Sequence, residues 1–283
     1  MRLSFNNKIK TGVGLASNSY KQILQSGEIT LRELLIWASG RGFAWVELRD
    51  PEVNYQPAEL VRIREFADKL DLRIHYAWDT EVIFGEKEVF ERGIANAAVF
   101  GSGTYCRVVL SPKTCAGKGG YSDKEADELL EKVEDYTAQA ETFGISLCFE
   151  NSSETISGKG KNLLGMNELL TRFPKMLSVL DAANFTNKTT VINPSAAEVF
   201  AYYKRFTGRI PYVHLKSTKE HFLLNQIVAD GDVNVLSLLD LITVNEKILV
   251  ALELPQQSGW RQLTNSVEES LSYLMGTEIT GIT

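Results

Sequence analysis

The sequence lacks any long hydrophobic run, and no window approaches the roughly 18 uninterrupted apolar residues that a membrane-spanning helix needs. Its first residues also lack the apolar stretch of a secretory signal peptide. Cysteine is scarce, and the three cysteines, Cys106, Cys115 and Cys148, have no metal-type spacing. Two of them lie in or beside apolar strand-like runs, which is typical of buried free thiols in a reducing compartment. These absences lead us to expect a cytoplasmic protein without a membrane partner.

The chain has little positive charge for its length. Its formal net charge is −6 and its pI is about 5.3. A protein that binds nucleic acid in general carries an excess of basic residues, so this balance argues against nucleic acid as a partner. With 44% hydrophobic and 23% charged residues, the composition is that of an ordinary globular protein.

Strand-like and helix-like segments alternate almost from end to end, which is typical of a parallel α/β sheet. We count eight repeats without a break in composition, and we predict one domain, residues 1–283, folded as a (β/α)8 TIM barrel. The expected strands are Thr11–Leu15, Ala44–Leu48, Leu72–Ala77, Tyr105–Leu110, Ser146–Glu150, Leu177–Asp181, Pro211–His214 and Leu249–Glu253. The expected helices are Thr30–Gly40, Pro57–Leu70, Glu86–Phe100, Ser122–Phe143, Leu163–Phe173, Ser195–Phe206, Val233–Leu241 and Ser266–Leu274.

A doubly wound open sheet shows the same alternation and is the structural alternative. Such a sheet usually carries a glycine-rich dinucleotide turn after its first strand. Gly12-Val13-Gly14 matches that turn only in part, and it lies within the expected strand. The barrel is therefore the preferred fold.

Four of the expected strands carry one possible metal ligand at or near the C-terminal end. These residues are Glu150, Asp181, His214 and Glu253, at intervals of 31, 33 and 39 positions. A (β/α)8 barrel spends roughly 31 residues on each strand-plus-helix unit, so consecutive strands would bring all four to one mouth. Three carboxylates and an imidazole form a mostly oxygen site that suits a divalent ion such as Mn, Mg or Zn. Any one of the four alone could simply mark the place where a strand surfaces.

Several motifs around these residues resemble those of the xylose isomerase-like TIM-barrel superfamily. They are Cys148-Phe149-Glu150-Asn151, Leu180-Asp181-Ala182-Ala183-Asn184, Tyr212-Val213-His214-Leu215-Lys216, Ala251-Leu252-Glu253 and Gly42-Phe43-Ala44-Trp45-Val46-Glu47-Leu48-Arg49. That superfamily holds sugar phosphate isomerases and epimerases, inosose dehydratases and AP endonucleases. The resemblance covers nearly the whole chain.

The resemblance implies that Glu150, Asp181, His214 and Glu253 bind one divalent metal ion, with Mn, Mg, Zn and Co all open. It further implies that Glu150 and Glu253 act as the catalytic acid–base pair, in proton transfer α to a carbonyl of a sugar or polyol substrate. The endonuclease relatives need a histidine cluster for three zinc ions, which a chain with three histidines cannot build. Barrels of this group often form dimers or tetramers, so a homo-oligomer is an option.

Further side chains near the expected mouth are candidates for substrate binding, each with a plainer alternative. They are Glu47, His75, Glu154, Asn184, Lys216 and Trp260. Glu47 could be a structural ion-pair partner, His75 a core residue, Glu154 an exposed loop residue, Lys216 a solvated lysine and Trp260 a core aromatic. Asn184 stands where several relatives have histidine, and Ser217 where relatives often have aspartate, so the substrate is left open.

The predicted activity is that of a metal-dependent sugar phosphate isomerase or epimerase. Two alternatives are kept. An inosose dehydratase-like lyase would use the same metal and glutamates to eliminate water when a leaving hydroxyl lies β to the abstracted proton. A non-catalytic sugar- or metal-binding barrel would bind the same ligands without turnover.

Overall fold

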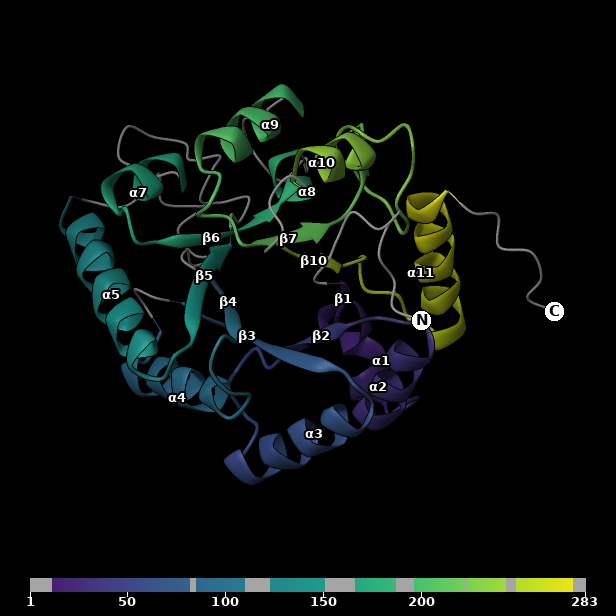
Figure 1. Cartoon of the computed structure of the whole chain (residues 1–283), viewed down its shortest axis with the longest axis horizontal. Helices are drawn as coiled ribbons and strands as arrows, with labels where there is room; N and C mark the ends of the chain where they lie inside the picture. Colours follow the sequence, from purple (N-terminus) through teal and green to yellow (C-terminus); the bar gives the residue numbers. More distant parts are fainter. Residues whose placement is uncertain are drawn as a thin grey trace.

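Eight parallel strands close into a barrel within the part of the chain that the computed structural model describes (Figure 1). The described residues are 12–81, 85–109, 123–150, 166–186, 196–220, 222–242 and 248–276. Around the barrel the strands are β1 (Val13–Ala16), β2 (Trp45–Arg49), β3 (Arg73–Glu81), β4 (Tyr105–Val109), β5 (Ser146–Glu150), β6 (Leu177–Asp181), β7 (Tyr212–Leu215) and β10 (Leu249–Leu252). The predicted (β/α)8 fold is confirmed, whereas the assignment of residues 1–283 to one domain stays a prediction.

The helices form a ring outside the strands in Figure 1. They are α1 (Lys21–Ser26), α2 (Leu31–Gly40), α3 (Pro57–Lys69), α4 (Lys87–Ala98), α5 (Asp123–Thr142), α7 (Met166–Arg172), α8 (Ala182–Thr186), α9 (Ala196–Arg205), α10 (Val235–Ile242) and α11 (Trp260–Met275). A 3-10 helix, η2 (Ser17–Tyr20), follows β1, and a small antiparallel hairpin, β8 (Thr218–Lys219) with β9 (Phe222–Leu223), follows β7. Among the helices in the described ranges, none has both the length and the apolar character that crossing a membrane requires.

Local sequence explains where helices begin. At α2, Thr30 Oγ1 accepts from the Glu33 backbone N–H at 3.2 Å, and the Glu33 carboxylate accepts from the Thr30 N–H at 2.7 Å. This reciprocal capping satisfies two backbone donors that the first turn leaves free. The predicted start of the last helix, Ser266, is wrong, because α11 begins at Trp260. Leu263 continues the buried stripe one turn earlier, so the apolar face begins before the predicted boundary.

The interior of the barrel changes from apolar to charged along the strands. Successive side chains of a strand point to opposite faces, so alternate residues line the interior. An inner apolar cluster is formed by Ala44, Trp45, Cys148, Val179, Tyr212, Leu249 and Ala251. Two residues further along, β5, β6, β7 and the end of β10 present Glu150, Asp181, His214 and Glu253. Alternation thus fixes an apolar floor beneath a polar mouth.

The inner layer depends on a close approach between β1 and β2. A Cβ built on Gly14 would lie 2.1 Å from Cε2 of Trp45, whose side chain is buried. Trp45 also donates from its indole nitrogen to the Gly12 carbonyl at 3.3 Å. Gly14 therefore makes room for the indole that fills this part of the barrel.

We expect Gly14→Ala to destabilise the protein by about 2 kcal/mol, because overpacking a rigid core typically costs 1–3 kcal/mol. The free energy of unfolding from urea titration would measure this loss. Gly40→Ala is the matched control, since a Cβ at Gly40 meets nothing within 4 Å. Equal stability of the two variants would contradict the assigned role of Gly14.

Candidate functional site

The C-terminal mouth of the barrel brings together Glu150, Asp181, His214 and Glu253. All four are buried, with exposures of 4%, 0%, 0% and 2%. Each offers one ligand atom, and these four atoms lie within 4.8 Å of one another. The four come from β5, β6, β7 and the residue after β10, which are neighbours in the barrel. We call these four residues the ligand cluster.

His214 is held from both sides of its ring. Its Nε2 lies 2.9 Å from Glu47 Oε2, and its Nδ1 lies 2.9 Å from Glu150 Oε1 and 3.0 Å from Glu253 Oε2. Tyr212 donates from its hydroxyl to the same Glu47 oxygen. With its proton on Nε2, His214 donates to Glu47, and the lone pair of Nδ1 faces the carboxylates of Glu150 and Glu253. A carboxylate behind the imidazole is the usual arrangement for a metal-binding histidine.

The donor atoms fit a divalent ion. Mg²⁺ takes donors at 2.0–2.1 Å in octahedral geometry, which places adjacent donors roughly 3 Å apart. The two separations from His214 Nδ1, 2.9 and 3.0 Å, match this spacing. Glu253 Oε2 is buried and accepts no aligned hydrogen bond, although the Lys216 ammonium lies 2.7 Å away. An oxygen in this state, within a set of three carboxylates and an imidazole, suits a hard divalent cation.

Three basic side chains compensate the acidic cluster. Arg107 donates from Nε to Glu150 Oε2 at 2.8 Å and reaches Asp79 with Nη1. The Lys216 ammonium lies 2.6 Å from Asp181 Oδ2. The third, Arg49, bonds Glu47 Oε1 at 2.6 Å and lies 3.5 Å from Glu253 Oε1.

These contacts set the protonation states of the acidic groups. Burial alone would raise the pKa of Glu150, but Arg107 and His214 outweigh it and lower the pKa to about 2. Burial would also raise the pKa of Glu253, but Lys216 and His214 outweigh burial and lower this pKa well below its usual value. For Asp181, burial dominates and the pKa is raised despite Lys216. Glu150 and Glu253 are therefore carboxylates at neutral pH, which is the form that binds a cation.

Several predicted substrate-binding residues join the ligand cluster. Glu47 is fully buried behind His214, and Lys216 bridges Asp181 and Glu253. Asn184 lies on α8, and its backbone N–H donates to Asp181 Oδ1 at 3.3 Å. Glu154 lies outside the described residues. Their roles in substrate binding stay predictions.

His75 and Trp260 are placed away from the ligand cluster. Trp260 packs among Trp37 and Tyr20 in the helix layer, with ring centroids 5.4 and 5.6 Å away. His75 points into the inner apolar layer, where its ring meets Trp45 edge-on at 5.1 Å. Both positions match the core alternatives that the sequence left open.

Arg107 and Asp79 belong to the site but were not among the predicted residues. The signal for Arg107 was present, since it is a charged residue in the middle of the otherwise apolar β4. A charge in such a strand is kept only where a buried counter-charge meets it. Asp79 carries a weaker signal, because the expected strand ended at Ala77 whereas β3 continues to Glu81.

Comparison with known proteins supports the fold. No protein-family model matches the chain, and no curated protein sequence is similar to it. Among solved structures, the chain is similar to D-allulose 3-epimerase from Methylomonas sp. in complex with D-allulose, with a TM-score of 0.66 at 12% identity over 94% of this chain and 96% of that one. It is also similar to a sugar phosphate isomerase/epimerase from Parabacteroides distasonis, with a TM-score of 0.64 at 16% identity over 93% of both chains.

A third similar structure is a xylose isomerase-like TIM-barrel protein from Mycobacterium smegmatis in complex with magnesium. Its TM-score is 0.61 at 15% identity over 87% of this chain and 88% of that one. The TM-scores of 0.61 to 0.66 agree with the predicted (β/α)8 barrel, and at identities of 12 to 16% the likeness shows the fold alone.

We expect Arg107→Met to destabilise the metal-free protein by about 3 kcal/mol, because it removes the buried cation that pairs with the buried Glu150 carboxylate, whereas Asp79 keeps Arg49 at 3.1 Å. Urea unfolding in the presence of a chelator would measure the loss. Lys219→Met is the matched control, since its pair with Asp230 is exposed at 48% and 70% and should contribute less than about 1 kcal/mol. A loss no larger than that of the control would show that Arg107 does not compensate the cluster.

The burial of His75 predicts a specific pH dependence of stability. Burial lowers its pKa from 6.5 to about 3, and its Nδ1 accepts from the Tyr105 N–H at 3.0 Å. The folded state thus keeps a neutral ring while the unfolded chain binds a proton below pH 6.5. The contribution of His75 to the free energy of unfolding is therefore complete above pH 6.5 and is lost as the pH falls toward 3.

In wild type, lowering the pH from 7 to 5 should therefore cost about 2 kcal/mol through His75 alone. His75→Asn keeps a hydrogen-bond acceptor for the Tyr105 N–H but has no titrating ring. Between pH 7 and pH 5, the free energy of unfolding of this variant should therefore fall by about 2 kcal/mol less than that of the wild type. Identical pH profiles would refute the neutral, buried state of His75.

Proposed function

We propose that this protein is a sugar isomerase or epimerase that transfers a proton α to a carbonyl, with one divalent ion held by Glu150, Asp181, His214 and Glu253. The observation that carries the proposal is the buried convergence of these four ligand atoms within 4.8 Å at the barrel mouth. In (β/α)8 enzymes this face carries the active site. Similar structures include enzymes named as D-allulose 3-epimerase and as a sugar phosphate isomerase/epimerase, which supports a sugar as the substrate class.

The ion, when bound, supplies a Lewis acid for the negative charge that develops on the substrate oxygens. Mn, Mg, Zn and Co all suit the donor set. Asp181 and His214 hold the ion, and Glu47 orients the imidazole through Nε2. Asp181 is itself oriented by the backbone N–H of Ala183 at 2.9 Å.

Glu150 and Glu253 are the proposed acid–base pair. Both are carboxylates at neutral pH, so each begins the reaction able to accept a proton. The glutamate that accepts the substrate proton can return it only after that first transfer. Glu150 is held by Arg107, which donates from Nε to Oε2 at 2.8 Å. Glu253 Oε2 lies 2.7 Å from the Lys216 ammonium, so this carboxylate too is kept ionised by a neighbouring cation.

Lys216 is the proposed hydrogen-bond donor to a substrate oxygen. Its side chain is 15% exposed, more than the 5% of Arg49 or the 9% of Arg107. Burial disfavours its charge, but Asp181 and Glu253 outweigh burial and raise the pKa well above the usual value. The ammonium therefore stays charged and can stabilise an enediolate oxygen.

We expect the purified wild type to contain one divalent ion per chain, and Asp181→Asn to lose it, because the substitution removes a charged ligand. Elemental analysis after incubation with Mn or Zn measures both. Asp230→Asn, at an exposed aspartate, is the control and should keep the ion. Absence of an ion from the wild type, or its retention in Asp181→Asn, would contradict the proposal.

With the ion bound, the wild type should incorporate solvent deuterium into a ketose substrate. Glu253→Gln should slow this exchange by about 10²–10⁴, the usual contribution of a positioned acid–base group. Mass spectrometry of the sugar after incubation in deuterated buffer gives the rate. Normal exchange by a metal-loaded Glu253→Gln variant would remove Glu253 from the acid–base role.

A further inference from the structure

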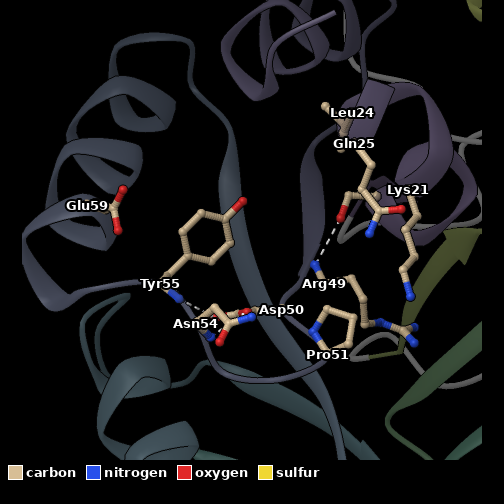
Figure 2. A pocket seen from close by; sticks show the side chains of 10 residues that line it. Lys21, Leu24, Gln25, Arg49, Asp50, Pro51, Asn54, Tyr55 and Glu59 are labelled. Atoms are coloured by element: carbon tan, nitrogen blue, oxygen red, sulfur yellow. Dashed lines mark hydrogen bonds between the residues drawn. The ribbon is translucent and has the colours of Figure 1, made fainter. Parts of the chain in front are cut away.

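A cavity of about 390 Å³ lies beside the ligand cluster, between the segment after β1 and the loop after β2 (Figure 2). Its walls include Ser17, Lys21, Gln25, Arg49, Asn54 and Tyr55. The cavity and the cluster share a residue as their wall, because Arg49 lines the cavity and its guanidinium lies 3.5 Å from Glu253 Oε1. Asn18, next to Ser17, donates to that same Glu253 oxygen at 2.8 Å. The cavity and the cluster are therefore adjacent, with Arg49 and Asn18 between them.

The loop that forms one wall is rigidly built. The Asp50 carboxylate accepts from the Asn54 and Tyr55 N–H groups at 2.8 and 3.0 Å and from the Tyr76 hydroxyl at 2.6 Å. Between them Val53 is buried with φ at +55°, a conformation that a β-branched residue rarely adopts. Such strain persists where the surroundings over-determine it, and it clusters at functional sites. The wall is thus preformed, as expected of a binding pocket.

Two basic side chains, Lys21 and Arg49, line the end of the cavity nearest the cluster, and Arg49 is already paired with the acidic cluster. In Figure 2 the Lys21 side chain extends from α1 toward the guanidinium of Arg49. Lys21 lines the cavity and has no ion-pair partner among the described residues. Of the two acids in the lining, Asp50 is occupied by its three donors, and Glu59 lies across the cavity in Figure 2, where it accepts from the Gln56 N–H.

We propose that this cavity binds an anionic group, a phosphate ester or a carboxylate, at the end of the substrate remote from its reacting carbonyl. Lys21 pairs with the anion, and the exposed side-chain amide of Gln25 lies in the same lining to donate to its oxygens. An anion bound there neutralises the positive charge of Lys21. The inference rests on the proposed function, since it names the substrate class of the same site, and it points to sugar phosphates or sugar acids rather than neutral sugars.

The test is a calorimetric titration of the metal-loaded protein with four probes: inorganic phosphate, a ketohexose 6-phosphate, a hexuronate and the neutral ketohexose. We expect the phosphorylated or the carboxylated sugar to bind at least tenfold more tightly than the neutral one, and the tighter of the two identifies the anion. Lys21→Gln should abolish this preference, and Lys21→Arg should retain most of it. A hydrogen bond to a charged group typically contributes about 1.5–3 kcal/mol, which corresponds to a tenfold effect or more.

Lys204→Gln is the matched control, because Lys204 is an exposed lysine on α9, on another side of the barrel (Figure 1). It should leave all four affinities unchanged. Equal affinities for charged and neutral sugars, failure of every anionic probe to bind, or an unchanged preference in Lys21→Gln would each overturn the proposal.

The outcome is separable from that of the proposed function. A protein that takes up one ion and exchanges solvent deuterium on neutral ketoses, without a Lys21-dependent preference, refutes the anion pocket alone. A protein that binds no ion yet keeps a Lys21-dependent preference for the charged sugar supports the pocket and refutes the proposed chemistry.

Discussion

The structure depends on the compensation of buried negative charge at the barrel mouth. Glu47, Glu150, Asp181 and Glu253 are each no more than 4% exposed. Moving an ionised carboxylate out of water costs several kcal/mol even after relaxation, so four of them would unfold the barrel if they had no partners. Arg49, Arg107 and Lys216 reach into the same group and pair with it. The cations are thus as necessary to this mouth as the ligands are.

Barrel geometry distributes this compensation around the ring. Arg107 on β4 meets Glu150 on β5, the adjacent strand. Lys216 follows β7 and bridges carboxylates from β6 and β10, the two strands that pair with β7. Each cation therefore links neighbouring strands across a hydrogen-bonded pair. Shifting any one strand by a residue would turn its charge outward and leave its partners unpaired, so the charges also help to fix the register.

The sequence predicted the parts of this arrangement that depend on strand ends. The four ligands could be found because each follows an apolar run at a spacing of one barrel unit. Of the cations, Lys216 was predicted as a substrate-binding residue from its place two residues after His214. Arg107 was not predicted, although its charge in the middle of the apolar β4 was a signal, because its partners Glu150 and Asp79 come from the two neighbouring strands, β5 and β3. His75 was placed too near the mouth because the expected strand ended at Ala77, whereas β3 continues to Glu81 and leaves His75 deep in the barrel. The sequence predicts a rim position for Trp260 because the helix is expected to begin at Ser266, whereas α11 begins at Trp260 itself.

The charge balance also bears on the kind of ion that the site suits. The cluster and its second carboxylate layer contain five acids, Glu47, Asp79, Glu150, Asp181 and Glu253, against the three cations Arg49, Arg107 and Lys216. With all eight groups ionised and a neutral imidazole, two negative charges remain, which a divalent ion neutralises. Without an ion, burial would favour a neutral His214, but Glu253 and Glu47 outweigh burial and raise its pKa. The added proton offsets only one charge and occupies the nitrogen that faces the ligands. A divalent cation would therefore satisfy both the donor geometry and the electrostatics of this mouth.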